Sequence, residues 1–181
     1  MLALVTGGSG SGKSEFAENL CLSIHRKKGQ IPMVYVATMY PYDEEAYKKI
    51  GRHIELRKNK NFDTAECFTN LAGLNLKNPG TTVLLEDLSN LVSNEIWLEG
   101  GAGPDTDQAV QAGIEHILAQ GADLVVVSNE ISSDGMEYDP ETAKFQKHIG
   151  MLNTWIAGKA DFAAEIVYGI PLIHKGKDIT F

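Results

Sequence analysis

The sequence has few cysteines, no long apolar run and no excess of positive charge. Its two cysteines, Cys21 and Cys67, lack the spacing of a metal site or a disulfide framework, which predicts reduced, unreactive thiols. No apolar run approaches the roughly 20 residues that a membrane-spanning helix needs. The first residues lead into a glycine-rich segment without a basic leader, so we expect no secretion signal, no membrane span and a cytoplasmic protein.

Negative charge predominates over positive charge. The 181 residues include 16 lysines and arginines against 24 aspartates and glutamates, a formal net charge of −8. This balance excludes bulk attraction to nucleic acid or anionic lipid, so any polyanion must be bound by a local site with its own positive potential. Hydrophobic residues make up 43% and charged residues 22%, which excludes a disordered chain. The length predicts one domain over residues 1–181.

Short apolar runs alternate with longer amphipathic ones along the chain. The predicted strands are residues 2–6, 33–38, 82–86 and 122–128, with one or two short strands in 165–175. The predicted helices are residues 14–28, 43–57, 88–98, 107–120 and 141–159. Strands that are apolar throughout and alternate with helices indicate an α/β fold, with a mostly parallel sheet covered by helices on both faces.

A glycine-rich segment follows the first predicted strand. Gly7-Gly8-Ser9-Gly10-Ser11-Gly12-Lys13-Ser14 satisfies the Walker A pattern G-x-x-x-x-G-K-[ST] and opens the first predicted helix. Glycines let successive backbone N–H groups point inward, and the helix N-terminus adds positive potential. Lys13 would reach the β- and γ-phosphates, and the Ser14 hydroxyl would ligate Mg²⁺. The segment, which we call the phosphate loop, therefore predicts binding of a nucleoside triphosphate.

Two acidic residues end a later predicted strand. P-loop proteins usually place an acid there to hold the hydration shell of Mg²⁺, and Leu84-Leu85-Glu86-Asp87 fits this position. We favour Glu86 over Asp87 for the metal. The alternative is that either carboxylate only caps the helix expected from Leu88.

The helix predicted over residues 43–57 carries a histidine between two cations. Lys49, His53 and Arg57 recur at every fourth residue and would share one face. Neighbouring cations disfavour the imidazolium form, so His53 would be neutral near pH 7, as a nucleophile attacking phosphorus must be. The cations would then bind the attacked phosphate. Taken alone, the pattern is more typical of a solvated basic face that happens to include a histidine.

A set of segments in fixed order resembles one enzyme family. The segments are GGSGSGKSEFAE, YVAT, a helix ending RHIELR, TAECF, LLEDLSNLVSNEIW, VVVSNE, GMLN and YGIPLIHK. Together they resemble the bifunctional adenosylcobinamide kinase / adenosylcobinamide-phosphate guanylyltransferase family of cobalamin biosynthesis. The resemblance implies a RecA-like P-loop domain that forms trimers. It also implies phosphorylation of adenosylcobinamide by ATP or GTP, followed by transfer of GMP from GTP, which gives adenosylcobinamide-GDP and pyrophosphate.

The resemblance also implies roles for individual residues. His53 matches the family's histidine that becomes covalently guanylylated, and Lys13 lies in the matching phosphate loop. Ser14 and Glu86 would serve Mg²⁺. The further residues that match nucleotide contacts are Ala37, Thr38, Met39, Ile54, Glu55, Leu56, Arg57, Glu66 and Glu86. For Thr38 and Glu66, a strand-end hydroxyl and a helix-surface acid are the alternatives.

The chain also departs from the family pattern. Gly10 stands where the family usually has arginine, and residues 131–140 replace a glycine-rich stretch. Gln146 and Lys147 follow Phe145 in place of an arginine-aspartate pair. The last two departures lie away from the phosphate loop and concern the acceptor more than the nucleotide. Two other functions therefore stay open: a P-loop kinase of another small alcohol without guanylyl transfer, and a non-catalytic nucleotide-binding paralogue.

Overall fold

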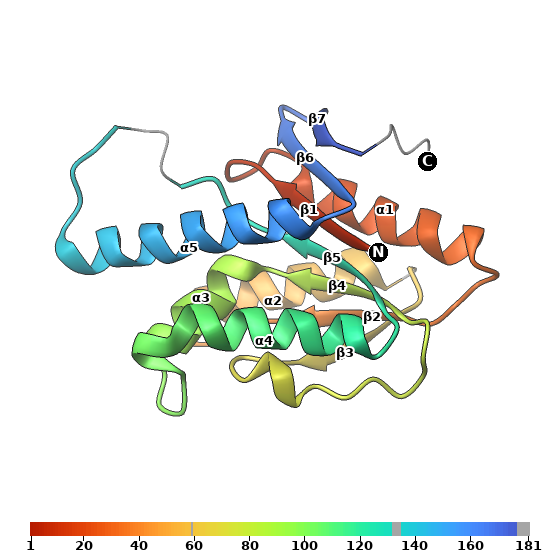
Figure 1. The fold of residues 1–181 in the computed structure, drawn as a ribbon, viewed down its shortest axis with the longest axis horizontal. Helices are drawn as coiled ribbons and strands as arrows, with labels where there is room; N and C mark the ends of the chain where they lie inside the picture. Colours follow the sequence, from red (N-terminus) through yellow and green to blue (C-terminus); the bar gives the residue numbers. More distant parts are fainter. Residues whose placement is uncertain (59, 132–134, 177–181) are drawn as a thin grey trace.

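A seven-stranded sheet forms the centre of the computed structural model, which describes residues 1–58, 60–131 and 135–176, without the side chains of Leu56 and Arg57. The strand order is β3-β2-β4-β5-β1-β6-β7, and only the β6–β7 pair is antiparallel (Figure 1). The strands are β1 (Leu2–Thr6), β2 (Met33–Ala37), β3 (Phe62–Glu66), β4 (Thr82–Glu86), β5 (Asp123–Val127), β6 (Phe162–Val167) and β7 (Ile170–Lys175). The α-helices are α1 (Lys13–Lys27), α2 (Glu44–Arg57), α3 (Leu88–Trp97), α4 (Thr106–Ala119) and α5 (Pro140–Lys159), and 3₁₀ turns occupy Leu71–Gly73 and Gly103–Asp105.

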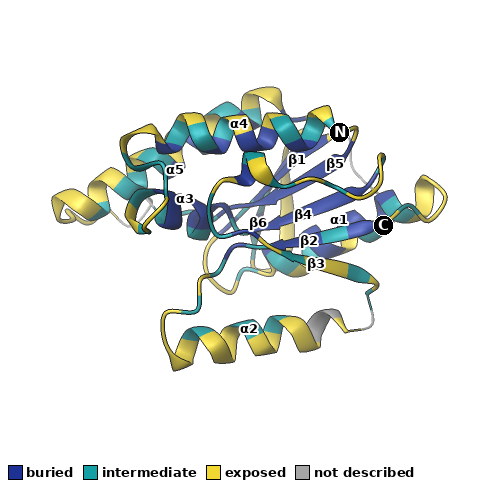
Figure 2. Cartoon of the chain, turned by 90° about the horizontal axis from the view of Figure 1, so that it is seen from below, coloured by how far each residue is buried: buried dark blue, intermediate teal, exposed yellow. Residues whose placement is uncertain are grey.

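Helices cover both faces of the sheet, as the sequence predicts. On one face, Ala17, Leu20 and Cys21 of α1 are buried with apolar side chains of β1, β5 and β6. On the other face, α3, α4 and α5 pack together, and Leu91, Ile114 and Leu152 have no exposed surface. Figure 2 shows the sheet as a buried layer between these helices. The central strands are buried on both sides because each is apolar at nearly every position.

One strand lacks the pattern that predicts strands from sequence, and another starts earlier than predicted. β3 (Phe62–Glu66) is an edge strand with exposed polar side chains, so it lacks the apolar run that identifies β4 and β5. Glu86 therefore ends the fourth strand and not the third. β6 begins at Phe162, before the predicted residue 165, and the tail forms two strands around Tyr168 and Gly169. Residues 132–134, which lie in the stretch that departs from the family pattern, are outside the described part of the chain.

The helix α2 stands apart from the core. None of its residues with a described side chain is buried, and Figure 2 shows it as an exposed element beside β3. Its half-buried residues Ala46, Ile50 and His53 lie on one face at helical spacing. The segment between α2 and β3 is held against α1 by an ion pair between Lys60 and the buried Glu18. α2 is thus fixed mainly by its ends and by one narrow face.

Two expectations from composition can be compared with the structure. Both cysteines are free and buried, and burial raises the pKa of each thiol, that of Cys67 to about 11. The thiols are therefore protonated at neutral pH, which makes them poor nucleophiles. In the described part of the chain, no helix combines the length and the apolar character required to cross a bilayer.

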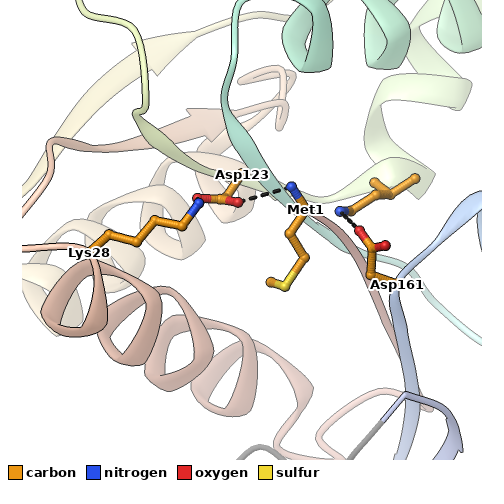
Figure 3. Close-up of polar contacts among 5 residues, drawn as sticks. Met1, Lys28, Asp123 and Asp161 are labelled. Carbon is orange, nitrogen blue, oxygen red and sulfur yellow. Dashed lines mark hydrogen bonds and ion pairs between the residues drawn. The ribbon is translucent and has the colours of Figure 1, made fainter.

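A buried aspartate joins the start of β1 to the rest of the sheet. Asp123 of β5 accepts hydrogen bonds from the amino group of Met1 at 2.9 Å and from Lys28 Nζ at 2.6 Å (Figure 3). Asp161 fixes the next residue by accepting a hydrogen bond from the Leu2 N–H at 2.8 Å. Burial alone raises the pKa of Asp123, but its two cationic partners outweigh burial and lower the pKa below 3.8. These contacts anchor β1, the strand that carries the phosphate loop.

Replacing Asp123 by asparagine should destabilise the protein in a pH-dependent way. The lowered pKa means that ionised Asp123 stabilises the fold above pH 3.8 and that this contribution disappears as the pH falls through the folded-state pKa. We expect Asp123→Asn to lower the free energy of unfolding by about 2 kcal/mol at pH 7. Urea titrations at pH 7 and at about pH 3 measure the effect, with Asp105→Asn, at an exposed site, as the control. An equal loss at both pH values would contradict this assignment.

Candidate nucleotide and phosphoryl-transfer site

The phosphate loop connects β1 to α1 and needs glycine at defined positions. Gly7, Gly10 and Gly12 have φ values of 153°, 71° and 93°, which side chains rarely permit. A Cβ atom on Gly7 would also lie 2.6 Å from both Ile166 O and Ser11 Oγ. The Oγ of Ser11 is buried without a hydrogen-bond partner in the described structure. The loop therefore has a tightly packed backbone that favours glycine at these positions and leaves no room for a side chain at Gly7.

The turn between β6 and β7 supports the outer side of the phosphate loop. The N–H of Gly169 donates to Ser11 O at 2.8 Å, and a Cβ on Gly12 would lie 3.5 Å from Gly169 Cα. On the opposite side, the Glu130 N–H donates to Gly7 O at 3.1 Å. The loop is thus held by β1, by the segment after β5 and by the β6–β7 turn, which preorganises its backbone donors for an anion.

Lys13, Ser14 and Glu86 meet at the C-terminal edge of the sheet. Ser14 Oγ donates to Glu86 Oε1 at 2.7 Å, and Lys13 Nζ donates to Gly8 O at 3.0 Å. Glu86 is buried, and its other carboxylate oxygen has no partner in the described structure. Burial raises the pKa of Glu86 to about 8, and the neighbouring Asp87 adds to this increase. Burial also lowers the pKa of Lys13, although Asp87 and Glu86 oppose the shift.

The two adjacent acids have different contacts. Asp87 caps α3, because its Oδ1 accepts a hydrogen bond from Asn90 N at 2.7 Å, whereas Glu86 faces Ser14. The side-chain amide of Asn129, after β5, donates to Asp87 Oδ2 at 3.1 Å. Burial nevertheless raises the pKa of Asp87. The capping alternative from the sequence therefore describes Asp87, while Glu86 lies beside Ser14, the residue predicted to ligate Mg²⁺.

A cavity of about 230 Å³ lies beside these acids and between β2, β3 and α2. Its lining includes the predicted residues His53, Glu66 and Glu86, together with Ala37 and Met39. The fold thus brings together residues that are spread over fifty positions of the chain. Residues lining the same cavity that the sequence analysis did not assign to the site are Tyr35, Pro41, Tyr47, Ile50, Phe68, Asp87 and Asn90.

The helix α2 presents Tyr47, Ile50 and His53 to this cavity. The spacing of three residues between them is a helical signal that could have identified Tyr47 and Ile50 from the sequence. Lys49, which the sequence analysis placed with His53, instead forms an exposed ion pair with Glu45 at 2.8 Å. The hydrogen bond to Glu45 raises the pKa of the Lys49 ammonium group. Lys49 is not among the residues that line the cavity.

The residues after His53 lie elsewhere or are not described. Ile54 is 55% exposed and lines a separate cavity with Phe62 and Thr64. Glu55 is exposed and lies 3.6 Å from Lys58 Nζ. The side chains of Leu56 and Arg57 are outside the described part of the structure. The predicted nucleotide contacts of Ile54 and Glu55 are therefore not brought to the cavity in this arrangement of α2.

The strand-end residues Thr38 and Glu66 occupy different environments. Thr38 is fully buried, and its hydroxyl donates to Asp87 O at 2.8 Å, so its side chain fixes the β4–α3 turn. Glu66 ends β3 opposite Ala37 and lines the cavity, which excludes the alternative of an acid on a helix surface. The ends of β2 and β3 thus place Ala37, Met39 and Glu66 on one wall of the cavity.

The oxygen donors around Ser14 suit Mg²⁺. The described residues contain no group of three or more histidine, cysteine, aspartate or glutamate side chains that could bind a metal by itself. Mg²⁺ commonly takes only one or two carboxylates and completes its shell with water and substrate phosphates. The Ser14 hydroxyl beside a buried carboxylate with an unpartnered oxygen provides such a partial site.

Comparison with solved structures identifies the fold. The flagellar accessory protein FlaH from Methanocaldococcus jannaschii is 12% identical, with a TM-score of 0.51 over 97% of this chain and 78% of its own. A KaiC-like protein from Pyrococcus horikoshii OT3 is also 12% identical, with a TM-score of 0.53 over 97% of this chain and 79% of its own. Together with the phosphate loop and the strand order, these similarities confirm the predicted α/β P-loop fold with a mostly parallel sheet.

Comparison with characterised sequences is more specific. The bifunctional adenosylcobalamin biosynthesis protein CobU from Salmonella typhimurium is 32% identical over 187 residues, which covers 94% of this chain and 97% of that protein. The protein of the same name from Escherichia coli is 32% identical over 186 residues with the same coverage. The model of the family "cobinamide kinase / cobinamide phosphate guanyltransferase" matches residues 3–173. The chain therefore belongs to the cobinamide kinase / cobinamide phosphate guanyltransferase family.

Proposed function

We propose that this chain carries out both reactions of its family with the residues described above. In the first reaction, the hydroxyl oxygen of adenosylcobinamide attacks the γ-phosphorus of ATP or GTP. The bond to the bridging oxygen breaks, the nucleoside diphosphate leaves and the hydroxyl proton is released. Membership of the family and the phosphate loop support this reaction. Lys13 and the loop N–H groups stabilise the charge on the transferred phosphoryl group.

In the second reaction, a ring nitrogen of His53 attacks the α-phosphorus of GTP and pyrophosphate leaves. A phosphate oxygen of adenosylcobinamide phosphate then attacks the same phosphorus, the P–N bond breaks and adenosylcobinamide-GDP forms. This two-step route is covalent catalysis with imidazole as leaving group. The observation that carries the proposal is that His53 shares one cavity with Glu66 and Glu86, next to the phosphate loop.

The proposed nucleotide site combines the phosphate loop with the wall formed by Ala37, Met39 and Glu66. Ser14 and Glu86 would hold Mg²⁺, which neutralises charge on the phosphates when it is bound. The contacts proposed for Ile54 and Glu55 require α2 to change position when nucleotide binds. The exposed α2, which has no buried side chain among its described residues, is suited to such a change.

The proposal also covers assembly and location. We propose a homo-oligomer, a trimer by the resemblance of the sequence, and a cytoplasmic protein. The outer strand β7 supports association of copies, because it is an edge strand that exposes Ile170 and Leu172, next to the almost fully exposed Tyr168. An edge strand with exposed apolar side chains is a surface that proteins usually cover.

The first test concerns His53. GTP labelled at the α-phosphate should leave label on the wild-type protein, and His53→Ala should reduce this label to background because the nucleophile is lost. Phosphorylation of adenosylcobinamide by γ-labelled ATP should persist in His53→Ala. Arg52→Ala, the exposed neighbour on α2, is the matched control and should retain the label. Label retained in His53→Ala would refute the role of His53, and its absence from wild type would favour a kinase without guanylyl transfer.

The second test concerns Glu86. Between pH 4.5 and about 8 the folded protein retains a proton on Glu86 that the unfolded chain loses, so this carboxyl destabilises the metal-free fold increasingly as the pH rises. We expect Glu86→Gln to raise the free energy of unfolding at pH 8 in EDTA by roughly 1–3 kcal/mol. The same variant should weaken binding of Mg²⁺-nucleotide by about 10- to 100-fold. Glu99→Gln is the exposed control, and a variant that is less stable at pH 8 would contradict the prediction.

The third test concerns association. Light scattering should give three times the chain mass of 19.7 kDa for wild type. Leu172→Glu should shift the mass towards that of one chain, because a charge would be buried in the contact. Met136→Glu, at another exposed apolar residue, should leave the mass unchanged. A wild-type protein that is monomeric at micromolar concentration would refute the proposed assembly.

A further inference from the structure

A second cavity, of about 320 Å³, lies between α5 and the strands β1, β6 and β7. Its apolar part is formed by small and aliphatic side chains, including Ala157 of α5. Its polar part includes Thr6, Glu130, Asn153 and His174. Among the described residues that line it, none is a lysine or an arginine. The cavity is thus a mixed apolar and hydrogen-bonding site with little affinity for a polyphosphate.

This cavity adjoins the phosphate loop on the side away from His53. Thr6 immediately precedes Gly7, and the segment of Glu130 is hydrogen-bonded to Gly7 O at 3.1 Å. The first cavity includes residues of β2 and β4, whereas the second includes residues of β1 and β6. Since β5 and β1 separate β4 from β6 in the sheet, the phosphate loop at the end of β1 lies between the two cavities.

One polar atom of the second cavity requires a donor. Asn153 Oδ1 is buried and has no hydrogen-bond partner in the described structure, although a buried amide oxygen is normally satisfied. The hydroxyl of Thr6 and the carboxylate of Glu130 add further acceptors nearby. Such a lining recognises a ligand that is not an anion and that carries amide or hydroxyl N–H and O–H donors.

We propose that this second cavity binds one part of the acceptor of the kinase reaction, the alcohol arm and a neighbouring amide group of a cobinamide, so that the arm would reach the phosphate loop past Thr6. This inference rests on the proposed function, because the acceptor is the one that the family implies. The hydroxyl to be phosphorylated approaches the loop from the side of β1 and β6, while the nucleotide occupies the side of β2 and β4. Asn153 hydrogen-bonds an amide group of the acceptor, and Ala157 leaves room for its alkyl part.

Filling the cavity tests the proposal. Ala157→Phe should raise the KM for adenosylcobinamide at least tenfold in the kinase assay, because the added ring occupies the acceptor volume. The KM for ATP and the labelling of the protein by α-labelled GTP without acceptor should stay within twofold of wild type. Ala112→Phe on the exposed face of α4 is the matched control and should change none of these values. Asn153→Leu, similar in size to asparagine, should also raise the acceptor KM and serves if Ala157→Phe does not fold.

The outcomes separate this inference from the proposed function. A normal acceptor KM in both Ala157→Phe and Asn153→Leu, with intact activity, would overturn the acceptor site and leave the proposed function standing. If Ala157→Phe and Asn153→Leu lost self-labelling together with acceptor binding, Ala157 and Asn153 would have a structural role, and the inference would also be overturned. Absence of both phosphorylation and self-labelling in wild type would instead refute the proposed function.

Discussion

The hydrogen bond between Ser14 Oγ and Glu86 Oε1 joins two parts of the chain on which the site depends. It forms because β1, β5 and β4 are parallel neighbours that end at one edge of the sheet. The pairing register is strict, since a slip of one residue in β4 would turn Glu86 to the opposite face. The apolar runs of these strands therefore determine where a serine and a carboxylate meet. Burial of that carboxylate destabilises the metal-free protein, and a bound cation would reverse the effect.

The two helices on the nucleotide side differ in how firmly they are held. α1 buries residues along its whole length, so Lys13 and Ser14 start from a rigid element. His53 lies on α2, and the described side chains of α2 are at most half-buried. The connection that follows α2 is fixed by the Lys60–Glu18 ion pair. A rigid phosphate loop combined with a loosely packed helix for the proposed nucleophile suits a protein that would bind nucleotide in one way and react with it in two. Segments of low local stability are the ones that enzymes move.

The parts of the site that follow local chemical rules could be predicted, and those that depend on tertiary contacts could not. The phosphate loop is fixed by glycine spacing, and Glu86 follows from the apolar run that precedes it. β3 could not be predicted from the sequence because it is an edge strand that exposes polar side chains and has no apolar pattern. The position of Lys49 was misjudged because helical spacing alone does not tell which face of α2 meets the cavity. The sequence left open whether Glu86 or Asp87 caps α3, and only the tertiary structure shows that Asp87 accepts the capping hydrogen bond from Asn90 N.

One cradle for phosphate explains why a covalent intermediate suits this fold. In the proposed scheme, both GTP and the phosphorylated acceptor need the phosphate loop, since the lining of the second cavity supplies no lysine or arginine in the described structure. In this scheme the loop binds one phosphate chain at a time. Storing GMP on His53 and releasing pyrophosphate would empty the loop for the acceptor phosphate. The two cavities on either side would then bring the stored GMP and the acceptor to the same loop in turn.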